Sequence, residues 1–129
     1  MKERIRVPTA APWAESVGYS RAVRVGDTVY VSGTVAVDDE GRIASPGDPY
    51  GQARRCLEII VLALAEAGAS PNDVVRTRMF VIDPEDWVEV GRAHGEVFGE
   101  TKPATTLVAV AGLVDPEALV EIEAVAVLG

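Results

Sequence analysis

Two segments of this sequence consist almost entirely of apolar and β-branched residues, and they restrict its fold more than any other feature. Residues 106–110 read Thr-Leu-Val-Ala-Val and residues 124–128 read Ala-Val-Ala-Val-Leu, so both faces of each predicted strand are apolar. A strand with two apolar faces needs cover on both sides. The sequence offers only two long helical segments, enough for one face of a sheet. We therefore predict that a further copy of the chain covers the other face.

The hydrophobic pattern predicts six strands and two helices, arranged as a two-layer α+β or mixed α/β sandwich. The first helix has Asp48 as N-cap, Pro49 at its first position and Gly68 at its C-terminal end. The second begins after Asp83. Residues 8–18, with two prolines, are predicted to be irregular. The predicted strands are residues 3–7, 20–25, 28–32, 74–82, 105–111 and 119–128.

Alternation within residues 74–82 predicts which side chains share a face of that strand. We expect one face to carry Val75, Thr77, Met79 and Val81, and the other face to carry Val74. Alternation of this kind is typical of a strand that separates two different environments.

Length and charge limit the function. The 129 residues make one domain, 1–129, of ordinary hydrophobic content at 48%. The net charge of −8 repels phosphate backbones, so we expect no nucleic-acid partner. Residues 1–6 lack the apolar core of a secretory signal, and the longest apolar run, residues 59–65, is far short of the ~20 residues of a membrane span. We expect a soluble, cytoplasmic protein with no membrane partner.

Cysteine and histidine each occur once, as Cys56 and His94. An internal disulfide framework and a site that needs two imidazoles from one chain are therefore excluded. Asp38, Asp39 and Glu40 lack the alternating spacing of a calcium-binding loop. We expect no metal and no cofactor.

Seven short motifs follow one another along the chain. They are residues 18–23 (Gly-Tyr-Ser-Arg-Ala-Val), 30–34 (Tyr-Val-Ser-Gly-Thr), 52–54 (Gln-Ala-Arg), 67–70 (Ala-Gly-Ala-Ser), 73–77 (Asp-Val-Val-Arg-Thr), 102–106 (Lys-Pro-Ala-Thr-Thr) and 119–126 (Leu-Val-Glu-Ile-Glu-Ala-Val-Ala). In this order and spacing, they make the chain resemble the RidA/YjgF family, also called endoribonuclease L-PSP.

The resemblance implies a chorismate-mutase-like fold assembled as a homotrimer, with a central barrel and small-molecule clefts between subunits. It also implies hydrolysis of reactive enamines and imines, the products of pyridoxal-phosphate dehydratases, to 2-keto acids and ammonia. In the family, an arginine directly after Pro-Ala holds the substrate carboxylate. Here the motif is Pro103-Ala104-Thr105, and Leu107 takes the place of a frequent cysteine, so the resemblance implies that Thr105 and Leu107 lie at the substrate-binding site. The chain therefore resembles a branch of the family that lacks this arginine.

The family's remaining site residues are present as Tyr19, Ser32, Gly33 and Glu121. The resemblance places the hydrolytic water near Glu121. The residues themselves allow the same role, because a carboxylate in a partly dry cleft acts as a general base or acid. The alternative is a solvated or ion-paired strand carboxylate.

Three further residues are candidates for ligand binding, each with a structural alternative. His94 shares a helical face with Phe98 and either binds ligand or packs against the sheet. Arg21 shares a strand face with Tyr19 and either clamps an anion or is an ordinary surface arginine. Thr105 offers a hydroxyl to a polar ligand, although threonine is common in any strand.

Three functions remain open at this point. The first is hydrolysis of a small imine or enamine, assisted by Glu121. The second is binding of a small metabolite without turnover, which Thr105 in place of arginine favours. The weakest is an endoribonuclease, because the chain is acidic and has one histidine.

Overall fold

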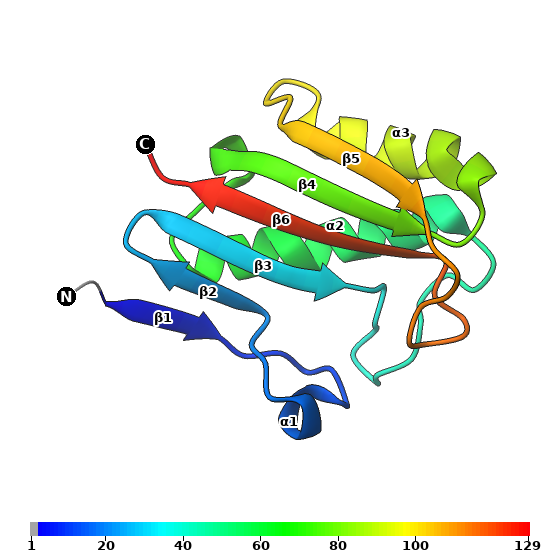
Figure 1. Ribbon diagram of the computed structural model, residues 1–129, viewed down its shortest axis with the longest axis horizontal. Coiled ribbons are helices and arrows are strands. Elements are labelled where there is room, and N and C mark those ends of the chain that lie inside the picture. Colours follow the sequence, from blue (N-terminus) through cyan, green and yellow to red (C-terminus); the bar gives the residue numbers. More distant parts are fainter. Residues whose placement is uncertain (1–2) are drawn as a thin grey trace.

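The computed structural model describes residues 3–129 and has the predicted two-layer α+β architecture, with one sheet and two long helices behind it (Figure 1). The sheet order is β1-β2-β3-β6-β4-β5, and only the β4–β5 pairing is parallel, so the sheet is mixed. The strands are β1 (Arg4–Val7), β2 (Ala22–Val25), β3 (Thr28–Thr34), β4 (Val74–Val81), β5 (Ala104–Ala109) and β6 (Val120–Val127); the helices are α1 (Ala14–Val17), α2 (Pro49–Glu66) and α3 (Trp87–Phe98).

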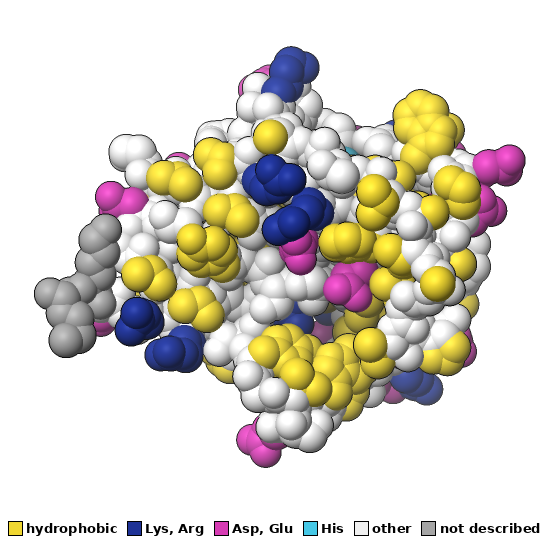
Figure 2. All heavy atoms as spheres, viewed as in Figure 1, with side chains coloured by type: hydrophobic (Ala, Val, Ile, Leu, Met, Phe, Trp, Pro, Cys, Tyr) yellow, Lys and Arg dark blue, Asp and Glu magenta, His cyan; other side chains and the backbone are white. Residues whose placement is uncertain are grey.

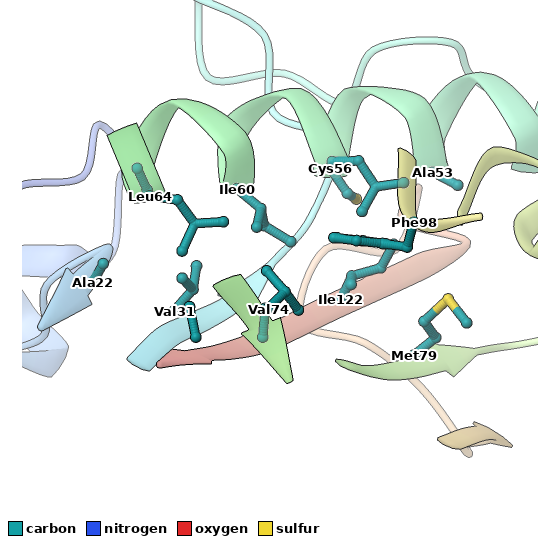
Figure 3. Close-up of a cluster of buried hydrophobic side chains, with 14 of the residues drawn as sticks. Ala22, Val31, Ala53, Cys56, Ile60, Leu64, Val74, Met79, Phe98 and Ile122 are labelled. Atoms are coloured by element: carbon teal, nitrogen blue, oxygen red, sulfur yellow. The ribbon is translucent and has the colours of Figure 1, made fainter. Parts of the chain in front are cut away.

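Helix α2 forms where the pattern predicts it. Asp48 caps its first turn by accepting a hydrogen bond from the Gly51 amide at 3.0 Å. Gly68 follows the helix with φ of +87°, a conformation that glycine adopts without steric cost. The buried side of α2 packs on the sheet, and Figure 3 shows this contact; the α2 residues in it include Ala53, Cys56, Ile60 and Leu64. Cys56 is buried in this contact, and burial raises the pKa of its thiol. The thiol is therefore a poor nucleophile, and Cys56 serves as a packed core residue.

The predicted alternation in β4 is wrong at its start. Val74 is buried, and Val75 and Arg76 are both exposed. A register shift between Val74 and Arg76 in the pairing with β6 explains this, since one extra residue shifts the phase of the alternation. From Thr77 onward the predicted faces are correct, with Thr77 and Met79 buried.

Other boundaries differ at the chain's turns. Residues 14–17 form α1, in a segment predicted to be irregular. Asp83 caps a short 3₁₀ turn, Pro84–Asp86, and α3 begins only at Trp87. β5 ends at Ala109, two residues before the predicted end. Short turns of this kind carry too few periodic positions for the sequence to reveal them.

The second face of the sheet is uncovered in the single chain, as the apolar pattern of the strands predicted. Tyr30 is 55% exposed, Val108 43% and Val127 42%. Figure 2 shows hydrophobic side chains spread over this face, with basic and acidic groups near its centre. A cross-strand ion pair lies on the same face, where Arg78 Nε is 2.6 Å from Glu123 Oε1.

Within residues 3–129, none of the helices combines the length and the apolar character needed to cross a bilayer.

Candidate functional site

A cleft of about 640 Å³ lies beside the open sheet face, between the segment that contains α1 and the end of β3. In Figure 2 it is the hollow between the sheet and the lower edge of the molecule. Residues from several distant parts of the chain line it, because β3 pairs with β6 and brings residues 32–34 next to residue 121. Among the predicted site residues, the cleft contains Tyr19, Arg21, Ser32, Gly33 and Glu121.

The Glu121 carboxylate packs against the backbone of Gly33. A β-carbon at position 33 would overlap Glu121 Oε2, so a glycine is needed for the carboxylate to lie where it does. Burial raises the pKa of Glu121, and the neighbouring charge of Glu123 raises it further, while Arg21 acts in the opposite direction. Glu121 therefore keeps its proton to a higher pH than an exposed glutamate does.

Arg21 holds the backbone beneath Glu121. Its side chain is 7% exposed, and Nη1 donates to the Ser32 carbonyl at 3.3 Å, the Gly33 carbonyl at 2.9 Å and Thr34 Oγ1 at 2.5 Å. These bonds span the register shift between β3 and β6, where the strand bends. Burial lowers the pKa of Arg21. The guanidinium is thus largely engaged by the protein itself.

Tyr19 and Ser32 complete this side of the cleft. The Tyr19 ring centroid lies 5.7 Å from Arg21 Cζ, and the ring is half-buried. Ser32 Oγ donates to the Ser20 carbonyl at 2.7 Å, which ties β3 to the residue that follows Tyr19. The structure thus places Tyr19 and Ser32 in the same cleft as Glu121, and their roles at a site remain predictions.

The other three predicted residues lie on the helix side of the sheet. His94 Nε2 and Thr105 Oγ1 are each 2.8 Å from Thr77 Oγ1, and Thr77 is fully buried on that side. Leu107 pairs with Met79 and packs against the core. His94, Thr105 and Leu107 therefore do not line the cleft of a single chain, and their ligand roles remain predictions.

The cleft also contains residues that the pattern did not single out. Trp13 and Val17 come from the segment around α1, and Asp38, Asp39 and Asp115 come from loops. No periodic signal marks loop residues, so only their placement in the fold brings them to the cleft.

Two side chains on α2 fix these loops. Arg55 Nε donates to the Val37 carbonyl at 2.9 Å, next to Asp38. Gln52 is fully buried and donates to the Glu117 carbonyl at 3.1 Å, while its Oε1 accepts from the Leu119 amide at 2.8 Å. The Gln52 motif thus holds the loop that carries Asp115. Among the described residues, no three potential metal ligands cluster together.

Comparison with known proteins gives one consistent result. The sequence model described as endoribonuclease L-PSP matches residues 9–128. The chain is similar, at 43% identity and a TM-score of 0.88, to the crystal structure of a YjgF/YER057c/UK114 family member from Mycobacterium tuberculosis, covering 98% of this chain and 100% of that one.

Two further relatives carry functional or family names. The 3-aminoacrylate deaminase RutC of Acinetobacter baylyi is 36% identical over 126 residues, which is 98% of each protein. The crystal structure of RidA from an Antarctic Psychrobacter species matches with 31% identity and a TM-score of 0.82, covering 95% of this chain and 94% of that one.

Proposed function

Since the chain belongs to the endoribonuclease L-PSP family, also known as RidA/YjgF, we propose that its cleft hydrolyses a small imine or enamine to a carbonyl compound and ammonia. The observation that carries the proposal is the Glu121 carboxylate, packed on Gly33 at a cleft and with a raised pKa. A general base works best when its pKa lies near the working pH, and partial burial moves a carboxylate in that direction. The deaminase name of the Acinetobacter relative supports the same chemistry.

The reaction needs only a placed carboxylate and a water molecule. Glu121 takes a proton from water as the water oxygen bonds to the imine carbon, and it returns this proton to the imine nitrogen, which becomes an amine. The deprotonated Glu121 then takes the hydroxyl proton of the carbinolamine as the C=O bond forms, and it passes this proton to the leaving nitrogen as the C–N bond breaks. Tyr19 and Ser32 lie beside the carboxylate and orient the ligand. The proton balance closes with one water consumed and one ammonia released.

We further propose that three copies assemble through the open sheet faces. That face exposes the side chains of Tyr30, Val108 and Val127. Removing their apolar surface from water would stabilise the assembly. Assembly would also bring other elements against the rim of the cleft. Sedimentation at micromolar concentration should give a trimer mass, and a stable single-chain particle would rule this assembly out.

Ammonia release provides the direct test. The full-length protein is mixed with 2-aminoacrylate and several other imines generated in situ, and release is compared with the uncatalysed rate. The rate acceleration by Glu121→Gln should be at least ~100-fold smaller than that by the wild type. Glu100→Gln changes an exposed residue outside the cleft and should keep the wild-type acceleration. No acceleration with any imine would refute the hydrolase.

Binding without turnover is the second candidate, and a specific observation favours it. Thr105 stands after Pro-Ala, where the family's arginine holds substrate, and its hydroxyl is hydrogen-bonded within the protein. A thermal shift with small carbonyl compounds, without product formation, would identify this function.

A further inference from the structure

The cleft contains more acidic than basic side chains. Among residues 3–129, its acidic lining consists of Asp38, Asp39, Asp115 and Glu121, and its basic lining consists of Arg21 and Arg55. Asp38 and Asp115 are only partly exposed, so solvent screens their charges incompletely. The electrostatic field of the cleft therefore opposes entry of an anion.

Both guanidiniums in the cleft are already bonded to other groups of the protein. Arg21 Nη1 bonds to two carbonyls and a hydroxyl, and Nη2 donates to Thr9 Oγ1 at 3.3 Å. Arg55 donates to the Val37 carbonyl, and its terminal nitrogens lie 3.3 Å from Glu58 and 3.7 Å from Asp39. Rotating either group toward a ligand would leave acceptors unpaired, which costs more than an exposed ion pair returns.

Thr105 adds no charge. Its hydroxyl donates to the Pro103 carbonyl at 3.1 Å and lies 2.8 Å from Thr77 Oγ1. A neutral hydroxyl that is already bonded does not replace a bidentate guanidinium.

From these contacts we infer that the cleft selects an uncharged imine, one that bears no carboxylate, over a 2-imino acid. The inference deepens the proposed function and relies on the same cleft, but it concerns the charge of the ligand. The uncharged ligand would place its C=N carbon near Glu121 and its apolar part against Trp13 and Val17.

A matched pair of imines tests the selection. Benzylamine, oxidised by a flavin amine oxidase, supplies the uncharged imine of benzaldehyde. Phenylglycine, oxidised by an amino-acid oxidase, supplies the same skeleton with a carboxylate. The full-length protein should accelerate ammonia release from the uncharged imine at least about tenfold more than from the anionic one. Equal or greater acceleration with the anion would overturn the inference and leave the hydrolase function intact.

A binding measurement separates this inference from the hydrolase proposal. Benzamide and benzoate have nearly the same shape and differ in charge, and their dissociation constants are measured by NMR titration. Benzamide should bind about tenfold more tightly. If benzamide is preferred while no imine is turned over, the charge selection holds and the hydrolase proposal fails. Equal or tighter binding of benzoate, or no binding of either compound, would overturn the charge selection.

Matched variants identify the charges responsible. Asp38 Oδ1 accepts from the Glu40 and Arg42 amides, and Asp115 Oδ1 accepts from the Glu117 amide, so asparagine keeps these bonds. The triple variant Asp38→Asn, Asp39→Asn, Asp115→Asn should tighten benzoate binding at least about threefold relative to benzamide binding. If benzoate binding does not change, the charge argument is wrong. The control removes three exposed acids outside the cleft and should leave both dissociation constants unchanged: Glu66→Gln, Glu85→Gln and Glu100→Gln.

Discussion

The carboxylate of Glu121 lies against the Cα of Gly33, where a β-carbon would overlap Oε2. The candidate base therefore packs directly against the main chain, with no side chain between them. Arg21 holds that main chain from below through the Ser32 and Gly33 carbonyls. The position of the carboxylate thus depends on a backbone shape that one buried guanidinium maintains.

Gly33→Ala should remove activity while leaving the fold nearly as stable. The new β-carbon meets the end of a flexible side chain, so Glu121 swings away and no backbone has to move. Imine hydrolysis should fall at least ~30-fold, and the melting temperature should change by only a few degrees. Gly112→Ala is the control, since a β-carbon there would meet no atom of the described residues within 4 Å. Unchanged activity in Gly33→Ala would mean that hydrolysis does not require the packing of the Glu121 carboxylate against Gly33.

Glu123→Gln should shift the pH dependence of the reaction to lower pH. The charge of Glu123 contributes to the raised pKa of Glu121, so removing it lowers that pKa. A general base is active when deprotonated, and the rising limb of kcat/KM against pH follows the same pKa. Arg78→Gln is the matched control, because it breaks the same 2.6 Å ion pair but leaves the negative charge in place. A downshift in both variants would assign the effect to loss of the ion pair.

Arg21→Lys should destabilise the fold although it keeps the charge. A lysine ammonium is a single point donor, so it leaves part of the carbonyl and hydroxyl set around Nη1 unpaired. A loss of ~2–3 kcal/mol is expected for acceptors left unpaired beneath a side chain that is 7% exposed. Denaturation in urea measures it, with the exposed Arg4→Lys as the control. Equal stability of the two variants would show that the charge alone is sufficient.

Local patterns in the sequence predict most of the fold. Helix α2 was predictable because its apolar residues repeat every three to four positions between Asp48 and Gly68. The buried position of Val74 was not, because a register shift is set by pairing with β6 and leaves no mark in β4 itself.

The site was predictable only in part, for the same reason. Motif resemblance identified Glu121 and Gly33, which lie together because β3 pairs with β6. His94, singled out by its helical face, and Thr105, which follows Pro-Ala, were further candidates, but a periodic pattern does not reveal on which side of the sheet such residues lie. In the fold, both reach Thr77 on the helix side of the sheet. Asp115 was missed because its place in the cleft depends on Gln52, far away in the sequence.

The chain's single histidine gives the final prediction. Thr105 donates to the Pro103 carbonyl, so the Thr77 hydroxyl donates to Thr105 and His94 Nε2–H donates to Thr77. Burial lowers the pKa of His94 below its usual value near 6.5. The unfolded chain therefore takes up this proton at a higher pH than the folded chain, and stability falls as pH drops below about 6.5.

His94→Gln should weaken this pH dependence, because glutamine donates a similar hydrogen bond but does not titrate. Urea denaturation at pH 7 and pH 5, at one protein concentration, should show that the wild type loses more stability on acidification than His94→Gln does. Thr77→Val is the matched control, since it keeps the titrating imidazole but removes the hydroxyl between His94 and Thr105. It should cost ~1–3 kcal/mol at both pH values and retain the wild-type pH dependence. Parallel losses in the wild type and His94→Gln would show that this histidine does not link folding to pH.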